Sequence, residues 1–387
     1  MEARATNFLN LEEFRAFCEK GRLAGTDGNK KAAETLKKYL EQAGFTPSEI
    51  VPKPTRRFFT LVFLCAGLLA ALSFLWKNPS FFIAFLLGMG LQLRLWLGIR
   101  RGAPLAIWGL RRAPCGVEPK PEGSGGLHPT LILCAHFDSA YAPFPFSGSP
   151  LRSLMSVVAL LVVTGFLSKT LHPAVGPIAL GSAFGYLYSA YLFGNASPGA
   201  DDNASGVFAV LECLRRFGHQ PGVNIIPVFF NYEEQGLIGS RAWWRRHFGR
   251  HGKGIPGVAV DPKQAYVINF DCVGRGRRVF VSGNRYLREQ LLATPTARAI
   301  KATRTWFYPS DHWVFRSPWK AVSFVRANRF WALDLGWVHS KKDTPTKINL
   351  EYVAEIATIV EECVRDLVAQ QAALRGKGNT TGDAGSN

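Results

Sequence analysis

Residues 225–240 read Ile-Ile-Pro-Val-Phe-Phe-Asn-Tyr-Glu-Glu-Gln-Gly-Leu-Ile-Gly-Ser and join an apolar run to a pair of carboxylates. The run at 225–230 predicts a strand, Gly236 predicts a turn, and a helix is expected to begin near Ser240. Neighbouring side chains on an extended backbone point in opposite directions, so Glu233 and Glu234 are expected to differ in role. One would bind a metal and the other would act as acid or base, although an exposed acidic turn would have the same sequence.

The composition is that of a large, basic and partly apolar chain. Its 387 residues allow one large domain or two, and its net charge of +18 suggests a nucleic acid or an anionic membrane surface as partner. Hydrophobic residues make up 47% of the chain and are unevenly spread, which favours the membrane. The seven cysteines form no Cys-x-x-Cys pair, which argues against a disulfide framework and against a thiolate zinc site.

Two apolar runs, at 58–76 and 81–99, are each long enough to cross a bilayer and are joined by a short polar turn. They predict a transmembrane hairpin, with a buried pair of core helices as the alternative. Residues 154–194 contain a second hydrophobic pair. Four crossings would leave every polar segment on one side of the membrane, and the clustering of Lys and Arg there, as at Arg56, Arg57, Arg100 and Arg101, predicts the cytoplasmic side. No signal-peptide apolar region is evident at the N-terminus.

The expected organisation is therefore one soluble domain that is interrupted twice. Residues 1–55 would form its N-terminal helical part, 56–101 a transmembrane hairpin, and 102–150 its first strands. Residues 151–195 would form the second hydrophobic hairpin, 196–374 the main part of the domain, and 375–387 a disordered tail. The predicted location is the inner or cytoplasmic membrane.

Metal-binding residue types recur where apolar segments end. In open α/β sheets such residues collect beyond the carboxyl ends of the strands, and imidazole with carboxylate suits zinc. Each segment alone has an ordinary explanation, such as a helix cap, a buried histidine or a polar loop. The segments are His136-Phe137-Asp138, Gly199-Ala200-Asp201-Asp202-Asn203-Ala204-Ser205-Gly206, Asn269-Phe270-Asp271 and His339-Ser340-Lys341-Lys342-Asp343-Thr344.

In this order, together with the Glu-Glu-x-Gly-Leu-x-Gly-Ser segment, the motifs resemble the co-catalytic zinc aminopeptidases of metallopeptidase family twenty-eight. That family includes bacterial leucyl aminopeptidases, glutamate carboxypeptidase and glutaminyl cyclase. The resemblance covers about residues 8–50, 103–140 and 198–370. It implies an α/β fold of the zinc-exopeptidase, phosphorylase/hydrolase-like kind, a mixed and mostly parallel sheet sandwiched by helices, into which the transmembrane hairpins would be inserted.

The resemblance also implies a role for each matching residue and a cofactor of two zinc ions. Asp202 would bridge the two ions, Glu234 and His339 would complete one site, and His136 and Asp271 the other. A cis peptide is implied between Asp202 and Asn203.

The remaining implied roles belong to residues that do not bind metal. Glu233 would be the general base that activates the attacking water. Asp138 would orient the His136 ring, and Asp311, within the family-like Ser310-Asp311-His312, would support the site from outside the ligand set.

The predicted function is that of a membrane-anchored, zinc-dependent exopeptidase, most simply an aminopeptidase acting on peptides. A glutaminyl cyclase-like acyltransferase is the first alternative, and Trp337-Val338-His339 is mildly reminiscent of it. An inactive membrane scaffold is the second. The basic runs at 241–250 and 275–278 are interpreted as solvated faces or contacts to anionic lipid headgroups, so no nucleic acid is expected. Aromatic residues at 306–308, 313 and 337 could form a pocket for an N-terminal side chain, or could simply pack.

Overall fold

The computed structural model describes residues 10–51, 104–112, 128–140, 197–234, 236–306, 308–328 and 338–380. The two predicted hairpins, at 56–101 and 151–195, lie outside these residues. Among the described helices, none combines the length and apolar composition that a bilayer crossing requires.

Eight strands of the described residues form one mixed sheet in the order β1-β2-β4-β3-β5-β8-β6-β7. Its centre, β4-β3-β5-β8, is parallel, whereas β1 and β2 extend one edge antiparallel and β6 pairs antiparallel with β8. The mostly parallel centre agrees with the predicted fold class. The strands are β1 (Phe45–Ile50), β2 (Ala106–Arg111), β3 (Thr130–His136), β4 (Asn224–Phe230), β5 (Ala265–Phe270), β6 (Arg278–Gly283), β7 (Thr303–Arg304) and β8 (Lys320–Ala327).

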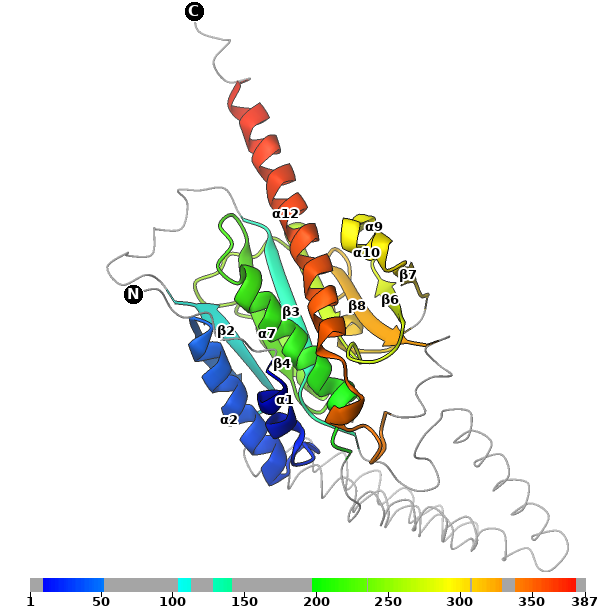
Figure 1. The fold of residues 1–387 in the computed structure, drawn as a ribbon. Coiled ribbons are helices and arrows are strands. Elements are labelled where there is room, and N and C mark those ends of the chain that lie inside the picture. The colour runs from blue at the N-terminus through cyan, green and yellow to red at the C-terminus, as the bar shows by residue number, and fades with distance from the viewer. Residues whose placement is uncertain are drawn as a thin grey trace, which may run out of the picture.

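Helices cover both faces of this sheet, and β3 shows why. Leu131 and Leu133 join the core that contains α1, α2, α7, α9, α10 and α12, whereas Ile132 and Cys134 join the core beneath α8. Side chains alternate along a strand, so a strand covered on both faces must be apolar at every position. Figure 1 shows α7 and α12 lying along one face of the sheet. The helices are α1 (Leu11–Cys18), α2 (Asp27–Gln42), α7 (Gly206–Phe217), α8 (Ile238–His247), α9 (Arg285–Ala293), α10 (Pro295–Ala299) and α12 (Leu350–Thr380).

The strand predicted at 225–230 agrees closely with β4, whereas the predicted C-terminal boundary of the domain differs from the structure. The helix α12 continues to Thr380, beyond the expected boundary at 374, so the first residues of the predicted tail are helical. Residues 381–387 lie outside the described residues. The antiparallel strands β1, β2 and β6 carry no metal-type motif and a weaker apolar pattern, and the sequence did not predict them.

Candidate active site

The predicted ligands come together at the carboxyl ends of the parallel strands. His136 ends β3, the Glu233–Glu234 turn follows β4, and Asp271 follows β5. Asp202 lies in the turn Ala200–Ser205 just before α7, and His339 lies between β8 and α12. Parallel neighbours end at the same edge, so residues that are far apart in sequence become neighbours there.

Asp202 occupies the centre of the cluster, and each of its oxygens faces a different histidine. Asp202 Oδ1 lies 3.2 Å from His136 Nε2, and Oδ2 lies 3.0 Å from His339 Nε2. A second carboxylate meets each imidazole: Asp271 Oδ1 is 3.6 Å from His136 Nε2, and Glu234 Oε2 is 3.1 Å from His339 Nε2. Two groups of potential ligands therefore share Asp202.

This donor set fits zinc. Each histidine directs a single ring nitrogen at two carboxylates, and imidazole with carboxylate is a normal zinc ligand combination. Glu234 Oε1 is buried and has no hydrogen-bond partner among the described residues, so it remains available to a cation. Burial, with the charge of Asp202, raises the pKa of Glu234 to about 7, which shows the cost of crowding these carboxylates without a cation.

The histidine contacts act on Asp202 in the opposite direction. Burial alone would raise the pKa of Asp202, but the hydrogen bonds from His136 and His339 outweigh it and hold the pKa well below its usual range. Asp202 is therefore a carboxylate in the folded protein, as a bridging ligand must be. The peptide bond between Asp202 and Asn203 is cis, as the resemblance implied.

Asp138 connects the His136 ring to the Glu-Glu turn. His136 Nδ1 lies 3.1 Å from the backbone oxygen of Asp138 and 3.5 Å from its Oδ1, which places the ring proton on Nδ1 and leaves Nε2 for the cluster. The backbone N–H groups of Glu233 and Glu234 donate to the same carboxylate at 3.3 and 3.4 Å. A fully buried Asp138 thus orients parts of both halves of the site.

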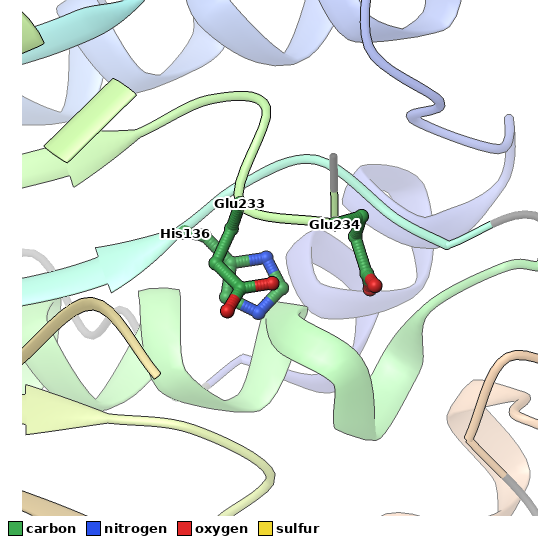
Figure 2. A group of neighbouring side chains, drawn as sticks. All are labelled: His136, Glu233 and Glu234. Carbon is green, nitrogen blue, oxygen red and sulfur yellow. The ribbon is translucent and has the colours of Figure 1, made fainter. Parts of the chain in front are cut away.

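The Glu-Glu pair departs from the expected alternation. The strand β4 ends at Phe230, Tyr232 has a φ of 59°, and the pair lies in a turn, so the alternation of a strand no longer applies. Both side chains leave the turn toward the cluster, and Figure 2 shows Glu233 beside the His136 ring. Their partners nevertheless differ, because Glu234 pairs with His339, whereas the Glu233 carboxylate has no ion-pair partner within the described residues.

Asp271 and Asp311 occupy the adjoining wall. Ser310 Oγ donates to Asp271 Oδ2 at 2.6 Å, and Asn269 Nδ2 donates to Ser310 Oγ at 2.8 Å, so a polar chain orients Asp271. Asp311 is fully buried, which raises its pKa to about 7. Its charge is one of the influences, after burial itself, that raise the pKa of Glu233.

Two supporting residues were not predicted as part of the site. Asp343 accepts hydrogen bonds from the backbone N–H groups of Asp201 and Asp202 at 2.7 and 3.0 Å, so it fixes the turn that carries the shared carboxylate. It follows His339 within the same sequence motif, which was the available signal.

The second is Arg22, which is fully buried and joins the two segments that carry His136 and Asp202. Its guanidinium donates to the backbone oxygens of Phe137, Pro198 and Gly199. It lies within residues 8–50, which the family resemblance covers, but its long-range contacts have no sequence signature.

The aromatic residues near the site do not form one pocket in the described part of the chain. Tyr308 is buried in a small core with Cys272 and Val338, whereas Trp306 is 85% exposed. Residues 307 and 337 lie outside the described residues.

The fold and the cluster together define an α/β protein of the zinc-exopeptidase type. The chain matches the model of peptidase family M28 over residues 119–364 and belongs to that family. A search of curated proteins found no match.

Solved structures resemble the chain in fold. A glutaminyl cyclase from Porphyromonas gingivalis is 15% identical, with 93% of this chain and 96% of that chain covered and a TM-score of 0.52. A Zn-dependent exopeptidase from Parabacteroides distasonis is 16% identical, with 93% and 97% covered and a TM-score of 0.50. The zinc aminopeptidase BSAP from Bacillus subtilis is 19% identical, with 68% of this chain covered and a TM-score of 0.43; the match spans 50% of that enzyme's length.

Proposed function

We propose that the protein is a membrane-anchored exopeptidase with two zinc ions, and that it removes N-terminal residues from peptides. The observation that carries the proposal is the placement of Asp202 between two histidines, each of which meets its own second carboxylate. One ion would be held by His136, Asp202 and Asp271, and the other by Asp202, Glu234 and His339.

Bound zinc supplies a water of lowered pKa and a positive charge for the developing oxyanion. The protein residues supply the proton transfer. Glu233 lies beside the cluster without an ion-pair partner among the described residues, so its carboxylate is free to take the proton of the attacking water and return it to the leaving amine. Asp138 binds the backbone N–H of Glu233 and so holds this base relative to His136.

Replacement of the base tests the proposal. We expect Glu233→Gln to keep zinc at the wild-type stoichiometry and to lower the hydrolysis of aminoacyl amides by about 10²- to 10⁴-fold, the usual contribution of a general base. The exposed Glu351→Gln on α12 is the matched control. A fully active Glu233→Gln enzyme would refute the assignment of the base, and one zinc per wild-type chain would refute the shared ligand.

A glutaminyl cyclase is the second candidate, since a cyclase of nearly equal chain length shares the fold at a TM-score of 0.52. Both activities need the same ligands, so the products distinguish them. A peptidase releases the N-terminal amino acid from peptides, including those that begin with residues other than Gln, whereas a cyclase converts N-terminal Gln and releases ammonia. A wild-type protein that retains no zinc after metal reconstitution would instead indicate a scaffold.

Membrane anchoring belongs to the proposal because of the apolar runs at 58–76 and 81–99. An even number of crossings leaves the site-bearing segments on one side, which the flanking arginines predict to be cytoplasmic. Extraction at alkaline pH tests insertion: an inserted chain stays in the membrane pellet, and release into the supernatant would contradict it. Protease added to sealed spheroplasts tests the side, and we expect the peptidase segments to be protected.

A further inference from the structure

A basic hollow of about 500 Å³ lies on the side of the molecule where α8 packs. No acidic residue lines it within the described part of the chain. Its principal lining residues are Leu237, Arg241, Trp244, Arg245, Trp313 and Arg316, and we call it the arginine hollow.

Both walls of the arginine hollow are attached to the candidate active site. On one wall, the backbone N–H of Leu237 donates to the backbone oxygen of Glu233 at 2.9 Å, so this wall is hydrogen-bonded to the turn that contains the proposed base. On the other, Trp313 N donates to the backbone oxygen of Ser310, whose hydroxyl binds Asp271. Leu237 follows Glu234 by three residues and therefore lies within about 11 Å of it. A peptide held at Glu234 can reach the hollow within about three residues.

Among the described residues, no acidic side chain compensates the charges of the hollow. Arg241 and Arg245 are one turn apart on α8, where like charges repel and weaken a helix. None of the three arginines meets a carboxylate of any residue that the structure describes. The arginines of α7 behave differently, because Arg215 and Arg216 both bind Glu212 at 2.6 Å. The unpaired guanidinium groups are therefore available to an anion from outside.

Trp244, which lines the hollow, is packed within an aromatic group. The Trp244 ring packs edge-on against Trp319, with ring centroids 5.3 Å apart, and against Phe315 at 5.5 Å. The Trp244 ring thus lies beside the guanidinium groups. Arginine binds a carboxylate through two parallel hydrogen bonds, so the hollow suits a short acidic side chain.

We propose that the arginine hollow binds a carboxylate of the peptide substrate within about three residues of the scissile bond. The carboxylate comes from an Asp or Glu side chain or from the C-terminus of a short peptide. This inference rests on the proposed peptidase function and adds a substrate class to it. An anionic lipid headgroup would also meet arginine and tryptophan, but lipid binding does not require a concave surface bonded to the catalytic turn.

Matched peptides test the proposal on the full-length, zinc-loaded protein. Peptides that differ only by Glu or Gln at each of the first four positions, and by a free or amidated C-terminus, give a ratio of kcat/KM for the acidic over the neutral form. We expect the wild-type ratio to exceed one at one position, and to fall about fivefold in Arg241→Gln and about tenfold or more in the double variant with Arg245→Gln. Added salt should lower the wild-type ratio.

Arg246→Gln is the control, because Arg246 is an exposed residue of the same helix that does not line the hollow. Calorimetric titration of the Glu233→Gln protein with the same peptides measures binding without turnover, and its affinity ratio should change in parallel.

Three outcomes would overturn the proposal. The first is a wild-type ratio near one at every position while neutral peptides are cleaved, which leaves the peptidase function intact. The second is an unchanged ratio in the double variant combined with a loss of binding to phosphatidylserine vesicles, which assigns the hollow to lipid. The third is a wild-type protein that cleaves no peptide, acidic or neutral, which refutes the peptidase function as well.

Discussion

Replacing Asp343 by Asn should loosen the turn that carries the shared carboxylate. Asp343 accepts the N–H groups of Asp201 and Asp202 at 2.7 and 3.0 Å, and all three residues are buried. Asparagine keeps one acceptor oxygen but turns an NH₂ group toward the other N–H. One hydrogen bond to a charged acceptor is lost, and one buried donor is left without a partner.

The magnitude follows from these two losses and one gain. A hydrogen bond to a charged group contributes about 1.5–3 kcal/mol, and an unsatisfied buried donor costs about 1–3 kcal/mol. Removing the charge of Asp343 also relieves repulsion, because that charge helps to raise the pKa of Asp201 after the larger effect of burial. We therefore expect a net loss near the lower end, about 2 kcal/mol of unfolding free energy.

Two assays separate stability from metal binding. Urea unfolding of the metal-free protein measures the free energy, and competition with a chelator measures zinc affinity, which should fall about 10- to 100-fold as for other residues that position ligands. Asp366→Asn, at an exposed position of α12, is the control. A loss below about 0.5 kcal/mol together with wild-type zinc affinity would refute the reasoning.

Further predictions concern groups around the site. Burial lowers the pKa of His312 to about 4, so the unfolded chain takes up a proton at a higher pH than the folded protein does. About 2 kcal/mol of unfolding free energy should therefore be lost between about pH 8 and pH 5. In urea unfolding, His312→Gln should flatten this pH dependence, and His251→Gln, at an exposed position, should not. Arg22→Lys should cost about 3 kcal/mol in the same assay, because a lysine cannot keep the donors that reach Phe137 and Gly199; an unchanged midpoint would contradict it. Removing zinc from the wild type should lower its melting temperature, and restoring zinc should reverse the change; a melting temperature independent of zinc would argue against a site formed in the folded state.

The sequence was most informative where residues are buried in parallel strands. The apolar run at Thr130–His136 and the run at Ala265–Phe270 are covered on both faces, so their composition is nearly sufficient to define them. The antiparallel strand β6 has four buried residues between two exposed ends, and only its first residue, Arg278, entered the sequence analysis, as part of the basic run at 275–278. Pairing with β8, a long-range contact, stabilises it.

The candidate site likewise has features that the sequence predicted and features that it did not. The resemblance of the motifs to the family was enough to name the five candidate ligands and Glu233, because metal binding restricts such positions to imidazole or carboxylate. The direction of the Glu-Glu pair was not predictable, since it depends on the turn at Tyr232 rather than on strand alternation.

Residue identity and order thus determined the family, the parallel centre of the sheet and the set of candidate ligands. Only the tertiary structure showed that Asp202 stands between two imidazoles, that Asp343 and Arg22 fix the segments around it, and that three arginines gather beside the Glu233–Glu234 turn. The physical reason is that a metal-binding residue type can be recognised in the sequence at each position by itself. The partners of a backbone N–H, a buried guanidinium or an uncompensated charge are set by segments that meet only on folding.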